Sequence, residues 1–402
     1  VNSIQITLSL LFAVNIWFIR RIFAVNISFF LRILYVIMAK YIYQYKNWPQ
    51  FTWDESRISA LLGEVRNLQG KIAGKMSFLG FSERDEASLI SLTIDVVKSS
   101  EIEGEILNYD QVRSSIAKKL GLNIGGLKTI DRNVEGVVEM MVDATQNYQK
   151  QLSHDRLFGW NAALFPTGYS GMRKLEVGQY RTKEIQIVSG PIGKEKIHYE
   201  AIEPKKLVKE MNTFLDWING NVNLDPVLKA AVAHFWFIII HPFEDGNGRI
   251  ARAVTDLLLS RAEGSPERFY SMSSQLMVQK KEYYAILQKV QHSDGDITDW
   301  LDWFFLCLKN ALIQAENGME KILNKSKFWN IHEGSVFNPR QRIIINKLLD
   351  GFDGKMRTSK WATLAKCSSD TALRDIKDLL DQGVFVQEDS GGRSTSYSLA
   401  PF

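Results

Sequence analysis

The sequence has little of what marks a disulfide-stapled, zinc-binding or nucleic-acid-binding protein. Its 402 residues include only two cysteines, Cys307 and Cys367, which lie far apart and form no metal-binding spacing. Both lie in apolar, helical stretches, so we expect buried free thiols in a reducing cytoplasm. The formal net charge of +4 is too small to argue for nucleic acid by itself. The composition, 45% hydrophobic and 23% charged, is typical of a globular protein long enough for two or three domains.

Long apolar runs are also scarce, and residues 1–37 are marginal as a membrane span. Their longest uncharged stretch ends at Ile19, contains Asn and Ser, and is followed by Arg20 and Arg21, whereas a span needs about 20 apolar residues. A signal peptide would carry its positive charge first and end at small residues, which this segment does not do. Met38 offers a start for the native chain. We therefore interpret residues 1–37 as translated upstream sequence, with a membrane anchor as the alternative.

Most of the chain has the three- and four-residue apolar spacing of amphipathic helices. Residues 38–104 predict an N-terminal helical region, and residues 105–324 a mainly helical core. Its helices are expected at about 110–120, 130–149, 153–165, 204–219, 226–240, 249–262, 279–291 and 297–323. In contrast, residues 183–202 contain two β-branched or alternating stretches around a Ser-Gly-Pro turn, which predicts a β-hairpin. The predicted fold class is all-α with one hairpin.

The C-terminal end predicts a smaller, separate domain. Residues 337–402 are expected to hold three helices followed by two short strands around a glycine turn, which is typical of a winged helix-turn-helix. Residues 325–336 are the expected linker to this domain.

The third helix of this domain lies where a DNA-reading helix would lie, but its charge does not favour that role. It carries both acidic and basic residues: Asp370, Asp375, Asp378 and Asp381 against Arg374 and Lys377. DNA phosphates attract net positive charge. DNA binding therefore stays open but is less favoured than a protein-recruiting or dimerising role.

A segment of twelve residues, 241–252, carries most of the chemistry. It reads His-Pro-Phe-Glu-Asp-Gly-Asn-Gly-Arg-Ile-Ala-Arg and lies between two apolar helical runs. The start of a helix has free N–H groups and a positive dipole end, which suit phosphate. Gly246 and Gly248 let the backbone approach an anion closely and adopt positive φ. The pattern predicts an anion-binding turn between two helices.

The charged residues of this segment complete a site for phosphoryl or nucleotidyl transfer. Arg249 and Arg252 are three apart, so both lie on one face of the second helix and can neutralise phosphates. Asp245 can hold a hard cation such as Mg²⁺ through oxygen, and His241 is a base that titrates near neutrality. A base, a metal carboxylate, an anion-binding turn and two arginines are the parts that such a transfer needs.

The segment resembles the signature of the Fic family, His-Pro-Phe-x-x-Gly-Asn-Gly-Arg-x-x-Arg, at every specified position. The resemblance covers about residues 48–310 and implies a protein adenylyltransferase, which moves AMP from ATP onto a Ser, Thr or Tyr hydroxyl of a target protein. It implies that His241 is the base and that Asp245 holds Mg²⁺. The ATP-contacting residues that it implies are Phe243, Glu244, Asp245, Gly246, Asn247, Gly248, Arg249 and Arg252, with Asn247 at the α-phosphate, the arginines at the β- and γ-phosphates, and Phe243 anchoring the loop.

A second segment, Ser99-Ser100-Glu101-Ile102-Glu103-Gly104, resembles the inhibitory motif of the same family, Ser/Thr-x-x-x-Glu-Gly/Asn. It lies N-terminal to the core, as in one class of these proteins. Ser99 and Glu103 are four apart and share one helix face. The resemblance implies that Glu103 forms a bidentate pair with Arg252, takes the place of the γ-phosphate and leaves ATP wrongly aligned. An inert acidic helix end is the alternative.

The hairpin at 183–202 lies where Fic proteins have a flap, which pairs with an extended target segment by strand addition and aligns its hydroxyl with the histidine. The resemblance therefore implies that a target protein docks on this hairpin. A second copy of the chain stays open as a partner. The nucleoside contacts that it implies are Tyr283, Tyr284 and Gln291, with Val188, Ser189 and Gly190 of the flap; core packing is the alternative for the tyrosines.

Three other functions stay open on the sequence. The same site could remove AMP, with Glu103 positioning water. It could transfer UMP, phosphocholine or phosphate in place of AMP. The chain could instead act mainly as a DNA-binding regulator through residues 335–402.

Overall fold

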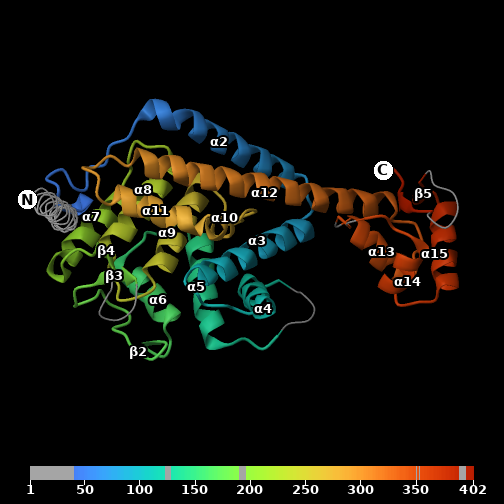
Figure 1. Cartoon of the computed structure of the whole chain (residues 1–402), viewed down its shortest axis with the longest axis horizontal. Coiled ribbons are helices and arrows are strands. Elements are labelled where there is room, and N and C mark those ends of the chain that lie inside the picture. The colour runs from blue at the N-terminus through green and yellow to red at the C-terminus, as the bar shows by residue number, and fades with distance from the viewer. Residues whose placement is uncertain (1–39, 123–127, 190–195, 350, 353, 389–394) are drawn as a thin grey trace, which may run out of the picture.

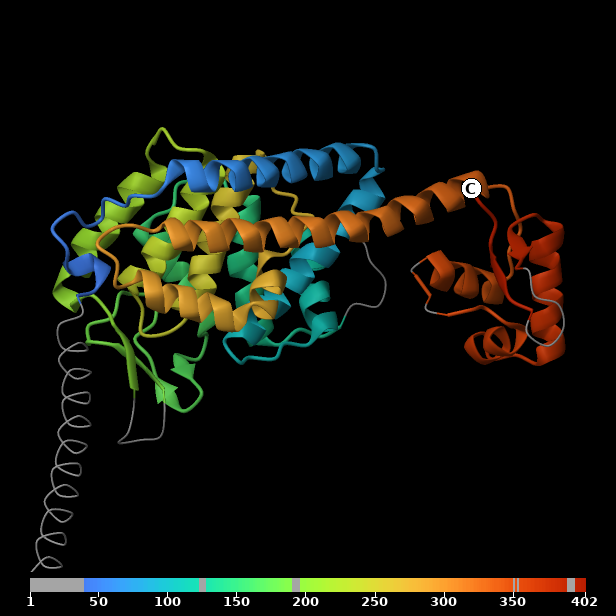
Figure 2. The same ribbon diagram turned by 45° about the horizontal axis from the view of Figure 1, so that its top comes forward.

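A computed structural model describes residues 40–122, 128–189, 196–349, 351–352, 354–388 and 395–402. These residues form a large helical body and a small C-terminal body, joined by one long helix, α12 (Thr298–Ile331) (Figures 1 and 2). The extension at residues 1–37, discussed above as upstream sequence or membrane anchor, lies outside the described residues. Among the residues that are described, no helix is long and apolar enough to cross a membrane.

The large body is built from helices whose bounds lie close to those expected. Two antiparallel helices at its centre, α8 (Pro226–Ile240) and α9 (Asn247–Glu263), carry the 241–252 segment between them. Helix α8 is apolar on nearly every side, and such a helix is stable only when it is buried all round. The surrounding helices are α2 (Glu55–Ser77), α3 (Phe81–Ile102), α4 (Tyr109–Leu120), α5 (Arg132–Gln146), α6 (His154–Leu164), α7 (Leu207–Asn219), α10 (Met272–Val278) and α11 (Lys280–Val290), with short 3₁₀ turns η1 (Ile42–Gln44) and η2 (Pro204–Lys206).

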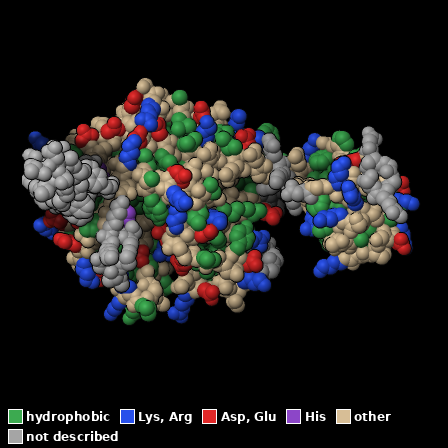
Figure 3. Space-filling model, viewed as in Figure 1, with side chains coloured by type: hydrophobic (Ala, Val, Ile, Leu, Met, Phe, Trp, Pro, Cys, Tyr) green, Lys and Arg blue, Asp and Glu red, His purple; other side chains and the backbone are tan. Residues whose placement is uncertain are grey.

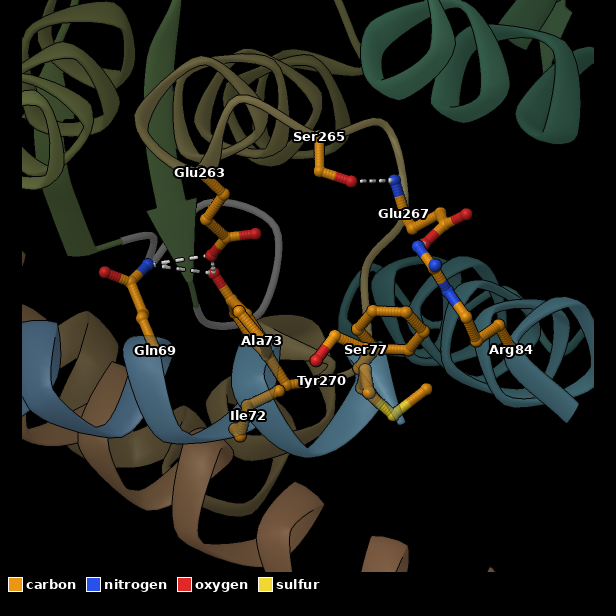
Figure 4. Close-up of a pocket in the computed structure, with 11 residues that line it drawn as sticks. Gln69, Ile72, Ala73, Ser77, Arg84, Glu263, Ser265, Glu267 and Tyr270 are labelled. Atoms are coloured by element: carbon orange, nitrogen blue, oxygen red, sulfur yellow. Dashed lines mark hydrogen bonds and ion pairs between the residues drawn. The ribbon is translucent and has the colours of Figure 1, made fainter. Parts of the chain in front are cut away.

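Helices α2 and α12 lie side by side along one edge of the large body in both views (Figures 1 and 2). Helix α2 starts where Asp54 accepts hydrogen bonds from the backbone N–H groups of Ser56 and Arg57, the usual satisfaction of free N–H groups at a helix start. A hollow of about 200 Å³ lies between α2 and the segment after α9 (Figure 4). Its polar groups bind one another. The Gln69 amide donates to the Glu263 carboxylate at 2.7 Å, and the Tyr270 hydroxyl donates to the same carboxylate oxygen. These hydrogen bonds attach α2 to the end of α9. No residue of the 241–252 segment lines the hollow.

The strands are few and pair only as short antiparallel hairpins among the described residues. They are β1 (Tyr169–Ser170) with β2 (Arg173–Lys174), β3 (Gln186–Ser189) with β4 (Lys196–Glu200), and β5 (Phe385–Gln387) with β6 (Tyr397–Leu399). In the β3–β4 hairpin Ile187 faces Tyr199, and the register shifts after Ile187. The predicted hairpin at 183–202 is confirmed, and the fold is mainly helical, as predicted.

The C-terminal body has its own apolar core, with Trp361 and Ile376 at its centre. Its elements are α13 (Pro339–Leu349), α14 (Thr358–Leu364), α15 (Ser369–Asp381) and the β5–β6 hairpin. The three helices and the hairpin lie where they are expected, and the winged-helix assignment itself stays a prediction. One argument from the sequence changes: Asp375 does not face solvent with the other acids, because it is buried and paired with Arg340 at 2.7 Å.

Three expectations differ from the structure. Residues 325–331 continue α12 instead of forming a linker, because no Pro or Gly interrupts them and Phe328 is buried in the C-terminal core. Helix α10 was not expected, since seven residues are too few for a clear apolar period. Cys307 is a buried thiol as predicted, but Cys367 follows the end of α14 and is only half-buried.

The crossing of α5 and α6 depends on a glycine. A Cβ at Gly136 on α5 would lie 1.8 Å from the carbonyl oxygen of Ala163, whereas a Cβ at Gly159 on α6 would have no atom within 4 Å. We expect Gly136→Ala to force the helices apart and to cost about 1–3 kcal/mol of stability. The matched control Gly159→Ala should be neutral or slightly stabilising, because Ala is the better helix former. Urea unfolding followed by tryptophan fluorescence checks both; equal transition midpoints would contradict the close packing.

Candidate active site

The loop between α8 and α9 holds its first and last residues in a left-handed conformation. His241 ends α8 with φ 52° and ψ 59°, and Gly246 precedes α9 with φ 83°. A side chain in this region is strained, and such strain persists only where the surroundings enforce it. Asn247 supplies part of the enforcement: its amide accepts from the Phe243 N–H at 3.0 Å and donates to the Phe243 carbonyl at 2.8 Å. The loop is therefore a rigid turn.

The imidazole of His241 is oriented by the end of its own helix. Its Nδ1 lies 3.3 Å from the Ile238 carbonyl oxygen. Because a carbonyl only accepts, Nδ1 must carry the proton, which leaves the lone pair on Nε2. Burial is the main cause that lowers the pKa of His241 to about 4. The hydrogen bond to Ile238 raises this pKa, the charge of Arg181 lowers it, and Glu103 and Asp245 raise it by lesser amounts. The ring is therefore neutral at pH 7, as a general base must be.

Arg252 is buried on α9 and bound to the end of α3. Its Nε donates to the Ser99 hydroxyl at 2.8 Å, and its Nη2 donates to the Ser99 carbonyl at 2.9 Å and to Oε1 of Glu103 at 2.7 Å. Only 4% of the Arg252 side chain is exposed. The contact between Glu103 and Arg252 is thus present, but through one carboxylate oxygen rather than the two expected from the sequence. Ser99 accepts from Nε and shares Nη2, and the buried Nη1 has no hydrogen-bond partner. The sharp turn that brings Glu103 there ends at Gly104, with φ 85°.

The other arginine of the segment has a carboxylate partner that was not expected. Arg249 donates from Nη1 to Oε2 of Glu105 at 2.6 Å, and its guanidinium lies 5.1 Å from the centre of the Phe165 ring. Glu103 and Glu105 are two residues apart on either side of Gly104, so the turn after α3 presents one carboxylate to each arginine. A sequence signal existed in the Glu-Gly-Glu order, but only the turn shows that both acids face the same helix.

Gly248 is what lets Glu103 approach. A Cβ at this position would lie 2.2 Å from Oε1 of Glu103 and 3.3 Å from Nη1 of Arg252. Any other residue would therefore displace the carboxylate or the guanidinium. The close approach that glycine allows serves the Glu103 contact in this structure, in the same place where the sequence predicts an approach of phosphate.

A cleft of about 560 Å³ opens beside the two carboxylates and Arg249. Its wall is formed by the turn after α3, the ends of α5 and α6, and the β1–β2 hairpin: Glu103, Gly104, Glu105, Asn133, Leu164, Phe165, Pro166, Thr167, Tyr169, Ser170, Gly171, Asp245 and Arg249. Charged groups of both signs are interspersed over the visible face of the large body (Figure 3).

Asp245 is placed to hold a divalent cation. Its Oδ1 accepts the Gly246 N–H at 2.7 Å, and its side chain lines the cleft, so Oδ2 is left for a ligand. No group of three or more His, Cys, Asp or Glu among the described residues could form a cage for a metal. A single carboxylate that shares the ion with substrate phosphates is the usual arrangement for Mg²⁺. The residues present fit that arrangement.

Two residues assigned to ATP binding have other contacts. Phe243 is fully buried and packs against Tyr180 and Phe158, as an anchor does. Glu244 turns away from the cleft, where its carboxylate accepts the Glu176 N–H at 3.1 Å and pairs with Lys183 at 3.3 Å. Its position between two cleft residues gave no sign of this, because the direction of a loop side chain depends on the neighbouring chain.

The predicted nucleoside contacts are not gathered at the cleft wall. The buried hydroxyl of Tyr283 bonds to His234 at 3.0 Å, and Tyr284 is 45% exposed. Gln291 is buried and donates to the His198 carbonyl of β4 at 2.7 Å. Val188 lies exposed on β3. The side chain of Ser189 and all of Gly190 lie outside the described residues, so the nucleoside contacts stay a prediction.

A neutral histidine base, an anion-binding helix start and two arginines define a site for transfer of a phosphorus-containing group. Residues 151–259 match the Fic/DOC family, and residues 41–122 match a domain of unknown function (DUF4172). The match to the Fic/DOC family thus includes the 241–252 segment, as its resemblance to the family signature predicts.

The relatives whose names state an activity align with this chain over only part of their length. It is 29% identical over 122 residues to "Protein adenylyltransferase fic-1" of Caenorhabditis elegans, covering 30% of this chain and 21% of that protein. It is 31% identical over 140 residues to "Protein adenylyltransferase Fic" of Nematostella vectensis, covering 34% of this chain and 29% of that protein. The matched stretch thus spans less than a third of these curated relatives.

The fold is shared more widely. The chain aligns with the crystal structure of a Fic family protein from Desulfovibrio desulfuricans G20 with a TM-score of 0.51 and 19% identity. The alignment covers 88% of this chain and 98% of that chain. The comparison supports the helical Fic fold.

We expect His241 to stay neutral between pH 7.5 and pH 5, because burial lowers its pKa from 6.5 to about 4. Since the folded pKa lies below the unfolded one, the folded state is also less stable as the pH falls from about 6.5 towards 4. Imidazole chemical shifts in a ¹⁵N-labelled protein, with His241→Ala to assign the signal, test this. A midpoint near 6.5 would show that the ring is solvated.

Proposed function

We propose that this protein transfers AMP from ATP to a Ser, Thr or Tyr hydroxyl of a target protein. The hydroxyl oxygen attacks the α-phosphorus, the bond from that phosphorus to the β-phosphate oxygen breaks, and the products are AMP–protein and pyrophosphate. The observation that carries this proposal is His241, whose Nδ1 is bound to the Ile238 carbonyl and which lies in the loop that leads into the start of α9. The names of the relatives, protein adenylyltransferases, support the choice of AMP.

His241 takes the hydroxyl proton on Nε2 as the oxygen attacks. The β3–β4 hairpin is the proposed docking site, where an extended target segment adds to the edge of a strand. Exposed Val188 and Ile197 offer apolar contacts for that segment. The target protein presents its hydroxyl from this hairpin, and a second copy of the chain is one candidate target.

The phosphates of ATP are held at the start of α9. Free N–H groups there, together with Arg249 and Arg252, oppose the negative charge. Asp245 would hold Mg²⁺, and the ion would supply neutralisation of the phosphate charge. The amide of Asn247 binds the Phe243 backbone on both sides, which stiffens the loop, and the second hydrogen of its Nδ2 is the proposed donor to the α-phosphate. Two unpaired thiols and the use of ATP fit the expected cytoplasm.

In the described arrangement this activity is restrained. Glu103 places negative charge on Arg252, where the γ-phosphate would bind, and Glu105 does the same at Arg249. ATP must displace carboxylates that are already paired, or bind without both arginines and with its α-phosphorus misaligned. Autoinhibition by the turn after α3 is therefore part of the proposal.

Removal of AMP by the same site is the second candidate, because Glu103 is 33% exposed and could hold a water molecule in the cleft. Transfer of UMP, phosphocholine or phosphate would use the same loop. A DNA-binding regulator that acts through residues 335–402 would not use this loop. Incubation of the protein with labelled ATP, UTP and GTP, followed by protein mass, separates the transfer reactions.

Glu103→Gly should raise AMP incorporation roughly ten- to a hundredfold, because it frees Arg252 to align the substrate. The measurement is the rate of AMP label on protein with ATP and Mg²⁺. His241→Ala in the same background should abolish incorporation. Equal rates for wild type and Glu103→Gly, with Arg252 intact, would reject autoinhibition, and phosphate mass in place of AMP would reject adenylylation.

Glu105→Gln should raise incorporation by a smaller factor, about two- to fivefold, because a part-exposed ion pair contributes up to about 1 kcal/mol. The double variant with Glu103→Gly should exceed either single variant, since the two carboxylates hold different arginines. Glu101→Gln is the matched control: Glu101 pairs with Lys98 on the same helix at 2.6 Å. A control that activates as strongly as Glu105→Gln would assign the effect to loss of acidic charge in general.

A further inference from the structure

Arg181 is a buried arginine whose hydrogen bonds all go to backbone carbonyl groups. It is 2% exposed and lies between β2 and β3. Its Nε donates to the His241 carbonyl at 2.8 Å, Nη1 to the Lys183 carbonyl at 2.9 Å, and Nη2 to the Ile202 carbonyl at 2.5 Å. Its backbone N–H donates to the Pro242 carbonyl at 3.0 Å.

These acceptors belong to three separate segments of the chain, and the geometry of the site depends on their relative positions. Lys183 precedes β3, Ile202 follows β4, and His241 is the candidate base. One guanidinium therefore joins both legs of the β3–β4 hairpin to the backbone of the base. The hairpin lies below the α8–α9 pair in Figure 1, and the three Arg181 hydrogen bonds connect the hairpin to the end of α8.

The burial of the Arg181 charge costs free energy, which a role in fixing the spacing between the hairpin and His241 would explain. Burying a cation without a counter-ion is unfavourable, and burial does lower the pKa of Arg181. No carboxylate among the described residues lies within ion-pair distance of it. Carbonyl oxygens are the remaining acceptors, and the planar fork of an arginine can span three of them where the single ammonium of a lysine cannot. An apolar side chain would pack there without the charge but would leave three carbonyls without a donor.

Two further hydrogen bonds hold the same part of the hairpin. The Tyr199 hydroxyl on β4 donates to the Ile239 carbonyl at 2.5 Å, two residues before His241. The Gln291 amide donates to the His198 carbonyl, also on β4. The hairpin is thus held at its base, close to the histidine, while β3 keeps exposed side chains for a partner.

We propose that Arg181 is a positioning residue that sets the distance between His241 and the strand to which a target segment adds. The proposal rests on the proposed function for its reaction, but its structural part does not. Arg181 touches neither nucleotide nor hydroxyl. It acts by keeping the docked hydroxyl within reach of Nε2, and misplacement by about 1 Å costs on the order of a hundredfold in rate.

The test compares Arg181→Lys with a matched control, Arg261→Lys, in the Glu103→Gly background. Arg261 also donates to three backbone carbonyls, those of Tyr148, Ile218 and Lys150, at the far end of α9. Three quantities are measured on each protein: the rate of AMP transfer to protein at saturating ATP, the Kd of ATP, and hydrogen–deuterium exchange of the amides at 183–189 and 196–202.

For Arg181→Lys we expect transfer to fall about 10- to 100-fold while the Kd of ATP changes less than about twofold. Hairpin amides should exchange at least about tenfold faster, with α8 and α9 unchanged. Arg261→Lys should keep both the transfer rate and the hairpin exchange, whatever it does to the unfolding temperature. Unchanged transfer, or transfer and ATP affinity lost together, would overturn the positioning role.

The exchange measurement separates this proposal from the proposed function. If the Glu103→Gly parent transfers no AMP, adenylylation is wrong, and unchanged hairpin exchange in Arg181→Lys would still reject the bridge. If Arg181→Lys does not fold, Tyr199→Phe removes one hydroxyl at the same junction. It should speed hairpin exchange and slow transfer by a smaller factor, and no change in either would overturn the proposal.

Discussion

The contact between Arg252 and the end of α3 is the constraint around which the site is arranged. A guanidinium buried on α9 must find acceptors, and α3 supplies three of them from Ser99 and Glu103. The acceptors stand where the proposed function puts a phosphate. In the proposed function one charged group thus has two alternative partners, a protein carboxylate and a nucleotide, and only one of them can be bound at a time. The Glu105–Arg249 pair extends the same competition to the second arginine.

This competition needs a rigid frame, because the Glu103 carboxylate and a phosphate have to meet the Arg252 guanidinium in the same place. Helix α8 is buried on nearly every side, and the loop after it is closed by the amide of Asn247. Gly248 leaves just enough room for Glu103 to reach Arg252. Arg181 connects the same loop to both legs of the β3–β4 hairpin. The proposed base, phosphate site and docking strand are therefore parts of one connected structure.

The sequence predicted the two helices and the turn of the 241–252 segment well, since both depend on local order. Apolar spacing placed α8 and α9, and the glycines placed the turn. It predicted the directions of side chains less well. Glu244 pairs with Lys183 and Gln291 binds β4, contacts that local order did not indicate, while their assignment to ATP and to the nucleoside stays a prediction. Local order cannot say which neighbouring segment a loop side chain will meet.

The residues at 241–252 and 99–104 by themselves determined which chemical groups are available: a base, a metal carboxylate, two arginines and an opposing glutamate. Their types and spacing are properties of the chain. Only the tertiary structure decided which groups meet. It brought Glu105 to Arg249 and Arg181 to His241 across long separations in sequence, because a buried charge binds whatever acceptors the packing of the helices brings within reach.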